Sequence, residues 1–84
     1  MLIDKDSIME RDDISIEDHA RLKGLLDIYE LFLESFTMLE KTKNILDKDD
    51  PLNEAVMCSL NDIHYGLSRT EYDIERILVK YGNH

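Results

Sequence analysis

Asp47-Lys48-Asp49-Asp50-Pro51 decides the fold, because this short acidic break separates two long runs whose apolar residues recur at helical spacing. Asp50 can accept hydrogen bonds from free N–H groups at a helix start, and Pro51 fits a first helical turn. A connection this short returns the second helix antiparallel to the first. The sequence therefore predicts an all-α fold, a long antiparallel helical hairpin with helices over about residues 16–47 and 51–81.

Ahead of the hairpin lies an acidic lead-in over residues 1–15, and residues 16–84 form the predicted hairpin domain. Ser15 is a suitable N-cap for the first long helix, and Gly82 is a suitable stop for the second. The segment Ser7-Ile8-Met9-Glu10 has the form of a capping box, which predicts a single helical turn around residues 8–12.

The first predicted helix carries more apolar surface than one hairpin seam can bury. Its seam has the three- and four-residue steps of a heptad pattern, interrupted at Lys43. A second apolar row lies outside that seam. The seam residues are Leu22, Leu25, Tyr29, Phe32, Phe36, Leu39 and Leu46, and the second row is Ile28, Leu31, Met38 and Ile45.

The second predicted helix has two opposed apolar faces. One is the hairpin seam, formed by Val56, Leu60, Ile63, Leu67, Thr70, Ile74, Ile77 and Tyr81. The other contains Cys58, Tyr65, Tyr72 and Val79, each seven residues apart, with Met57 and Leu78 beside them. Three explanations remain open: the lead-in covers this face with Leu2, Ile3, Ile8 and Met9, a second copy covers it, or a different protein docks there.

Size favours association with another chain. A domain of 84 residues rarely gains more than about 3–5 kcal/mol from a single core. Cys58 is the only cysteine, so the chain forms no internal disulfide, and no Cys/His set has zinc-ligand spacing. We expect a homodimer in which two hairpins form a four-helix bundle.

Charge and hydropathy limit the partners. The net charge of −9 disfavours direct binding to nucleic acid or to an anionic membrane, and it favours a basic partner or simple solubility. No apolar run approaches the roughly 20 residues of a membrane span, and residues 1–6 do not resemble a signal peptide. We expect a soluble, cytoplasmic protein that does not bind membranes.

Two interior glycines, Gly24 and Gly66, also call for an explanation. Each is unfavourable inside a helix by about 1 kcal/mol relative to alanine. Close approach of another backbone, or a bend, would explain them, and Gly66 has a position where a crossing helix could be admitted.

Residues with catalytic potential do not form a convincing site in the sequence. Glu30 and Glu34 point away from the predicted seam, and Glu71 and Glu75 share a side of the second helix without a facing pair. His64 has Asn61, not a glutamate, three residues before it, so it is interpreted as a packing residue at the seam edge. We expect no enzymatic activity, no cofactor and no metal.

The most favoured function is therefore a small acidic protein-binding module, a regulator, inhibitor or chaperone that occupies a partner's surface. The alternatives are an acidic mimic of nucleic acid that blocks a basic groove, and a magnesium-dependent all-α nucleotide hydrolase. The predicted protein interface comprises Met57, Cys58, Tyr65, Tyr72, Leu78, Val79, Ile28, Leu31, Met38 and Ile45.

Overall fold

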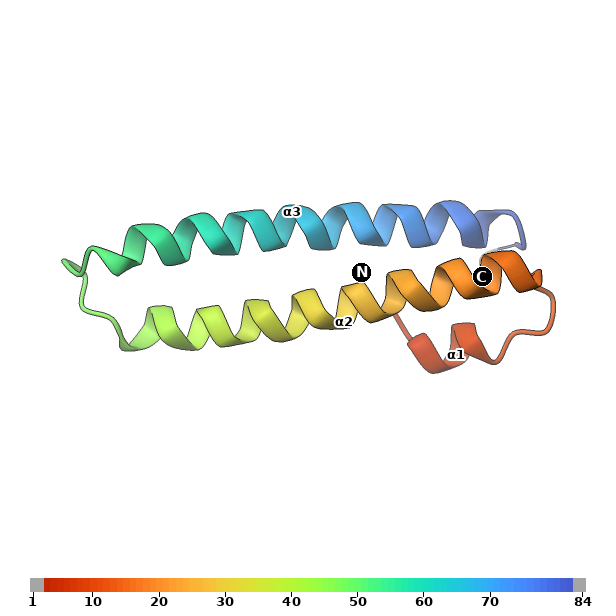
Figure 1. The fold of residues 1–84 in the computed structure, drawn as a ribbon, viewed down its shortest axis with the longest axis horizontal. Helices are drawn as coiled ribbons and strands as arrows, with labels where there is room; N and C mark the ends of the chain where they lie inside the picture. Colours follow the sequence, from red (N-terminus) through yellow and green to blue (C-terminus); the bar gives the residue numbers. More distant parts are fainter. Residues whose placement is uncertain (1–2, 83–84) are drawn as a thin grey trace.

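Two long antiparallel helices and one short helix make up the computed structural model, which describes residues 3–82 (Figure 1). These are α1 (Lys5–Met9), α2 (Ile16–Ile45) and α3 (Leu52–Val79), and residues 3–82 contain no strand. The elongated molecule measures 52 × 20 × 18 Å. The predicted all-α helical hairpin is confirmed. Leu2 of the lead-in and residues 83–84 of the hairpin domain lie outside the described residues.

The ends of the long helices follow the capping chemistry of the sequence. The Ser15 hydroxyl accepts from the Asp18 N–H at 3.2 Å, so α2 begins at the predicted residue. Helix α2 ends at Ile45, two residues earlier than predicted. Beyond the turn, the N-cap of α3 is Pro51 and not Asp50, but the Asp50 carboxylate still accepts from the Leu52 N–H at the helix start at 2.9 Å. Helix α3 ends at Val79, two residues before the predicted end.

The predicted capping box at Ser7 is wrong. Asp4 is the N-cap instead, and its carboxylate accepts from both the Ser7 N–H at 3.3 Å and the Ser7 hydroxyl at 2.8 Å. A carboxylate three residues upstream thus places Ser7 inside the first turn, and the helix covers Lys5–Met9, not residues 8–12.

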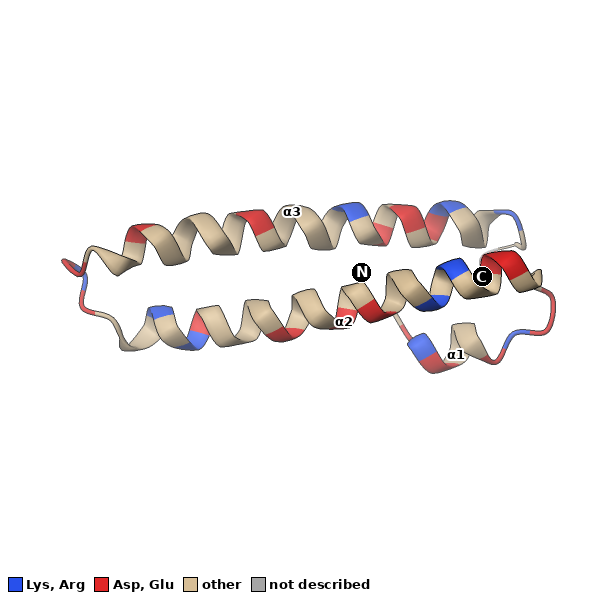
Figure 2. Cartoon of the chain, viewed as in Figure 1, with Lys and Arg blue, Asp and Glu red and all other residues tan. Residues whose placement is uncertain are grey.

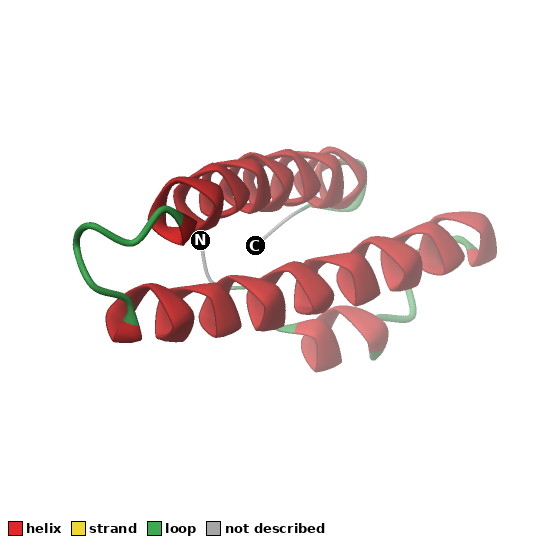
Figure 3. Cartoon of the chain, turned by 60° about the vertical axis from the view of Figure 1, so that its left-hand side comes forward, coloured by secondary structure: helices red, strands yellow, loops and turns green. Residues whose placement is uncertain are grey.

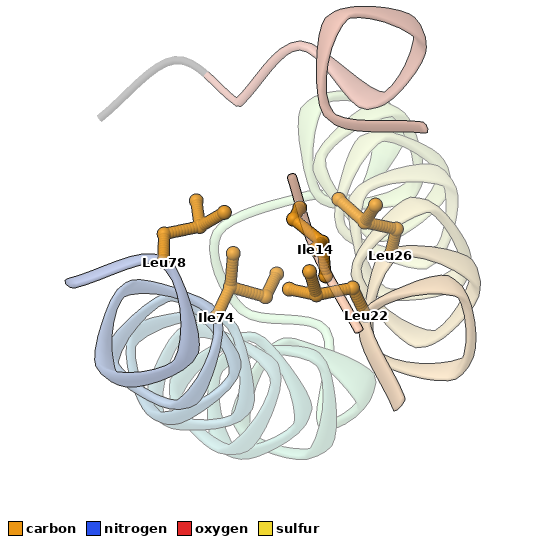
Figure 4. Close-up of a cluster of buried hydrophobic side chains, with 5 residues drawn as sticks. All are labelled: Ile14, Leu22, Leu26, Ile74 and Leu78. Carbon is orange, nitrogen blue, oxygen red and sulfur yellow. The ribbon is translucent and has the colours of Figure 1, made fainter. Parts of the chain in front are cut away.

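The main cluster of buried side chains lies at the open end of the hairpin (Figure 4), and Val56 and Leu60 of α3 are also buried, nearer the connecting turn. Leu22 and Ile74 are completely buried, and both belong to the predicted seam. Figure 4 shows side chains from α2, α3 and the lead-in converging there. The core cluster is Ile14, Leu22, Leu26, Ile74 and Leu78, with Ile3, Ile8 and Met9 of the lead-in packed against it.

Toward the connecting turn, the α2 side of the seam is less completely covered. Phe32, Phe36 and Leu39 keep to the predicted seam but are only half-buried. The Phe32 ring lies against Gly66, where an added Cβ would be 2.8 Å from the ring's Cζ atom. Gly66 is therefore in close contact with a side chain, the Phe32 ring of the other helix of the same hairpin, and not with the backbone of a crossing helix as the sequence suggested.

The lead-in forms a third element at the open end, where Figure 3 shows α1 beside α2. The Lys5 ammonium lies 2.8 Å from an Asp27 carboxylate oxygen and 3.3 Å from one of Glu30. A ring nitrogen of His19 lies 3.0 Å from the Met9 carbonyl oxygen. The hydrogen bonds to Asp27 and Glu30 raise the pKa of Lys5. These polar contacts surround the apolar packing of α1 and fix its position along α2.

A buried carboxylate joins the two long helices at the same end. Asp18 is only 7% exposed, accepts a hydrogen bond from the Tyr81 hydroxyl, and lies 3.4 Å from the Lys80 ammonium. Arg11 donates to the Tyr81 carbonyl oxygen at 3.0 Å, which adds the lead-in to the network. The Tyr81 hydrogen bond is the main reason that the pKa of Asp18 lies below its ordinary value.

Candidate protein-binding surface

The predicted second row of α2 lies on the surface of the hairpin. The exposed fractions are 46% for Ile28, 63% for Leu31, 68% for Met38 and 82% for Ile45. Steps of three and seven residues keep these side chains on one side of the helix. They form a line of exposed apolar groups, named here the α2 row.

The face of α3 opposite the seam is also exposed and apolar. Tyr65 is 73% exposed, Tyr72 54% and Val79 68%, and Met57 is 40% exposed. Cys58, on the same line, is exposed with a free thiol. These five residues are named here the tyrosine stripe.

Leu78 does not belong to this surface, so its inclusion in the predicted interface is wrong. It is 6% exposed and packs in the core with Ile74, Leu26 and Ile14. The physical reason is the core at the open end: Ile14 of the lead-in joins Leu22, Leu26 and Ile74 around Leu78, and Ile3, Ile8 and Met9 pack against this cluster. The same docking leaves Tyr65 and Tyr72 exposed, so the lead-in is not the cover of the tyrosine stripe.

The Tyr72 ring is held in place by two arginines of its own helix. The guanidinium carbons of Arg69 and Arg76 lie 5.6 and 5.8 Å from the ring centroid, which is within the range of cation–π attraction. Arg69 also pairs with Asp73 at 3.6 Å. The stripe thus presents an aromatic ring already positioned beside cationic groups.

A groove of about 550 Å³ runs between α2 and α3 at the open end of the hairpin. Its apolar lining includes Leu25, Ile28 and Ile77, so the α2 row begins inside it. Arg76 lines the groove and also lies over Tyr72, which connects the groove to the tyrosine stripe. The remaining lining residues are Ala20, Arg21, Gly24, Asp73 and Lys80.

Cations are concentrated around this groove, although the chain as a whole is acidic. Arg21, Arg76 and Lys80 line it, and Asp73 is the acidic residue among the described lining residues. Figure 2 shows blue segments on both long helices near the end that lies away from the connecting turn. The groove therefore combines an apolar floor with a positive local charge on a protein of net charge −9.

Several acidic residues of the long helices are engaged in contacts within the hairpin. Asp27 and Glu30 pair with Lys5, and Glu71 accepts from the buried Tyr29 hydroxyl at 2.9 Å. Burial, reinforced by this hydrogen bond, raises the pKa of Tyr29. Within residues 3–82, no group of three or more His, Cys, Asp or Glu side chains is placed to hold a metal ion.

His64 differs from its predicted position. It is exposed on α3, not packed at the edge of the seam. Its seam neighbours Leu60, which is buried, and Leu67, which is half-buried, fill the contact with α2, and the imidazole stays in solvent. A membrane-spanning helix would need a longer and more apolar run than any found among the helices of residues 3–82.

Comparison with known proteins gives no relative from which to infer the role of this surface: no family model, curated protein or solved structure matches the chain.

Sequence reasoning did not find the groove or the Asp18 network. In retrospect the sequence contains a signal for the groove. Arg21, Gly24 and Ile28 follow the three- and four-residue steps that place residues on one side of a helix. Asp73, Ile77 and Lys80 do the same on the second helix. A signal for Asp18 is its place four residues before Leu22, at the start of the seam. Neither pattern shows from the sequence which sides of the two helices come together.

Proposed function

We propose that this protein is a small binding module that acts by occupying the surface of another protein. The observation that carries the proposal is the exposure of large apolar side chains on two surfaces of the hairpin, the α2 row and the tyrosine stripe. Exposed apolar patches on a soluble domain are typical of protein–protein contact sites. Tyrosine and arginine, which adjoin at Tyr72, are enriched in such contacts.

We further propose that two copies associate through the α2 row to form a four-helix bundle. Leu31, Met38 and Ile45 are the most exposed apolar residues of this row, and they lie where the seam is least completely covered. Pairing of two hairpins there would bury Leu31, Met38 and Ile45 and cover the half-buried Phe36 and Leu39. The tyrosine stripe, on the opposite side of α3 from the seam, would stay available for a different protein.

Capture of partners with paired variants tests the binding function. The full chain, carrying an affinity tag, is expressed in the cell that naturally makes it, and captured proteins are identified by mass spectrometry. Tyr72→Asp should remove a specific partner, because a charge at the centre of an interface and the loss of an aromatic anchor each weaken binding. The partner, once identified, is purified and its Kd is measured against both forms.

The control is Lys41→Asp, an equally drastic change on the polar side of α2, which should leave capture unchanged. Circular dichroism must show the same helix content for all three proteins, so that loss of binding is not loss of folding. Identical capture by the wild type, Tyr72→Asp and a Met38→Asp variant would contradict the proposal.

The two other functions considered from the sequence have less support. A nucleic-acid mimic needs a dense, regular array of carboxylates, whereas Asp27 and Glu30 are neutralised by Lys5 and Lys23. A magnesium-dependent hydrolase needs converging carboxylates, and Glu71 already accepts a hydrogen bond from the Tyr29 hydroxyl. The binding function is therefore the proposal that the geometry favours.

A further inference from the structure

The two interior glycines of the long helices have different surroundings. Gly66 is required by the hairpin itself, because an added Cβ would meet the Phe32 ring at 2.8 Å. Around the equivalent Cβ position at Gly24, no described atom beyond the helix's own neighbouring backbone lies within 4 Å. Glycine inside a helix is less favourable than alanine, so packing within the hairpin does not explain Gly24.

The free space beside Gly24 belongs to the groove between α2 and α3. Without a side chain at this position, another backbone can approach α2 closely, which is a common reason for glycine at contact sites. The floor on both sides of Gly24 is apolar, formed by Leu25 and Ile28 of α2 and Ile77 of α3. The groove therefore suits a segment that brings an apolar side chain close to α2.

The charge around the groove defines the flanks of that segment. The side chains of Arg21 and Lys80 are 67% and 56% exposed, and they share one carboxylate, Asp18, at 3.8 and 3.4 Å. Asp18 also accepts a hydrogen bond from the Tyr81 hydroxyl, so its negative charge is shared among several donors. Asp73 in the lining and the shared Asp18 offset part of this charge, and the three cations Arg21, Arg76 and Lys80 still outnumber these two carboxylates. Carboxylates on a partner would be attracted to this excess of positive charge.

A second copy of the chain is a poor occupant of this groove. In a twofold dimer the same patch meets itself, so a groove-to-groove contact would bring Arg21, Arg76 and Lys80 of one copy toward the same cations of the other. Such juxtaposition of like charges disfavours the contact. The dimer proposed above uses the α2 row nearer the connecting turn, away from these cations.

We propose that the groove at Gly24 receives an acidic amphipathic helix of a different protein. Apolar residues of that helix lie on the floor of Leu25, Ile28 and Ile77, and its carboxylates on the flanks face Arg21, Arg76 and Lys80. An α-helix suits this site because helix surfaces dock into grooves between side-chain ridges, with closest approach where a residue is small. This inference rests on the proposed binding function and specifies the chemical nature of the partner.

Photo-crosslinking in the cell that naturally makes the protein tests this assignment. The photoreactive residue p-benzoylphenylalanine replaces Ala20 in the groove, Met38 in the α2 row, Tyr72 in the tyrosine stripe or Lys41 on the polar side, one at a time in the full chain. After irradiation, crosslinked peptides are sequenced by mass spectrometry. Position 20 should crosslink to a helical segment of another protein that has carboxylates flanking an apolar face, and position 41 should not crosslink to that segment.

Two further variants, each combined with the photoreactive residue at position 20, test steric fit and charge. Gly24→Leu places a side chain in the free space, where its Cβ meets no described atom within 4 Å, and Arg76→Glu reverses one of the three charges. Each should lower the yield of the crosslink by at least about tenfold, as expected for loss of a central contact or of a charged pair. Lys41→Glu makes the same charge change away from the groove and should leave the yield unchanged.

The outcomes separate this inference from the proposed function. A crosslink from position 20 to a second copy of this chain, to a basic segment, or to nothing would overturn the groove assignment. If positions 38 or 72 then still crosslink to a different protein, the binding function stands without it. If positions 20, 38 and 72 all fail to crosslink to another protein, both proposals fail.

Discussion

Single residues in this hairpin owe their effects to their immediate neighbours, as Gly24 and Gly66 show. Both lie inside long helices, yet a methyl group added at Gly24 meets open space, and one added at Gly66 meets the Phe32 ring. The intrinsic preference of a helix for alanine is the same at both sites. The difference in their surroundings must therefore decide the sign of the change in stability.

We expect Gly24→Ala to stabilise the isolated protein by up to about 1 kcal/mol. Gly66→Ala should instead destabilise it by about 1–2 kcal/mol, since the strain of overpacking exceeds the gain in helix preference. Urea titration followed by circular dichroism measures both changes. Phe32→Leu should reduce the loss at Gly66 and leave the gain at Gly24 unaltered. Equal effects at the two glycines would show that the Phe32 contact has been misplaced.

The Asp18–Tyr81 contact gives the protein a defined response to acid. The folded-state pKa of Asp18 is lowered, mainly by the Tyr81 hydrogen bond and then by Lys80. The stabilisation is thus fully present above the ordinary aspartate pKa of about 3.9, and it is lost as the pH falls through the lowered folded value. Other carboxylates, including Asp27, also have a lowered pKa in the folded protein. Only a comparison with a variant therefore separates the contribution of Asp18 to the pH dependence of stability.

Asp18→Asn should accordingly be less stable than the wild type at neutral pH, with a difference that shrinks as the pH falls below about 4. Thermal melts at a series of pH values measure this difference. Glu17→Gln, a neighbouring carboxylate on the exposed side of α2, is the matched control and should give a much smaller difference. A constant difference between Asp18→Asn and the wild type from pH 7 to pH 3 would contradict the assigned role of the charge.

At the scale of elements, the short lead-in determines which part of the hairpin has a core. Helix α1 has only five residues, too few to be stable alone, so its helicity depends on docking against α2. Its residues Ile8 and Met9 pack on the cluster that contains Leu26 and Leu78. The connecting-turn end has no corresponding third element among the described residues; Val56 and Leu60 of α3 are buried there, but the α2 side of the seam stays half-buried.

In a monomeric form of the hairpin, such as the double variant Leu31→Asp/Met38→Asp, backbone amides should therefore exchange hydrogen more slowly at the open end than near the connecting turn. Leu22→Ala, in the fully buried part, should cost about 2–5 kcal/mol, whereas Leu39→Ala, which is half-buried, should cost clearly less. Hydrogen-exchange mass spectrometry and urea titration provide the two measurements. Uniform protection along α2 in this monomeric variant would contradict the unequal packing of the two ends.

Detaching the lead-in is a separate test of the same arrangement. Ile8→Asp should undock α1, lower the melting temperature and increase exchange within residues 5–9, while most of the helical signal of α2 and α3 remains. Asp6→Ala, an exposed change in the same short helix, is the control. If Ile8→Asp behaves like this control, α1 does not contribute to the core.

At the scale of the whole molecule, the hairpin presents apolar groups on more surfaces than its own packing covers. The α2 row in particular leaves Leu31, Met38 and Ile45 largely exposed. Light scattering after size exclusion should report about twice the chain mass at micromolar concentration, and melting temperature should rise with concentration. The double variant Leu31→Asp/Met38→Asp should elute as a monomer, whereas Glu34→Ala should remain a dimer. A well-folded wild-type monomer under these conditions would refute the four-helix bundle.

The sequence by itself determined the hairpin, since its signals are local. Helical spacing, the Ser15 cap and the break at Asp50-Pro51 act within a few residues, and the structure follows them to within two residues at each end of the long helices. The same spacing separated the buried seam from the exposed α2 row. For the binding surface, nine of the ten residues predicted for the interface are exposed, and Leu78 is not.

Only the tertiary structure decided what happens at the open end. The side on which the lead-in docks determines the burial of Leu78, the exposure of Tyr72 and the engagement of Arg11 with Tyr81. The docking of the lead-in depends on contacts between residues up to about seventy positions apart in the sequence, such as Arg11 and Tyr81. Periodicity gives each helix its apolar sides but does not select which of them a third element covers. That selection comes from the summed packing and hydrogen bonding of segments that meet only in the folded chain.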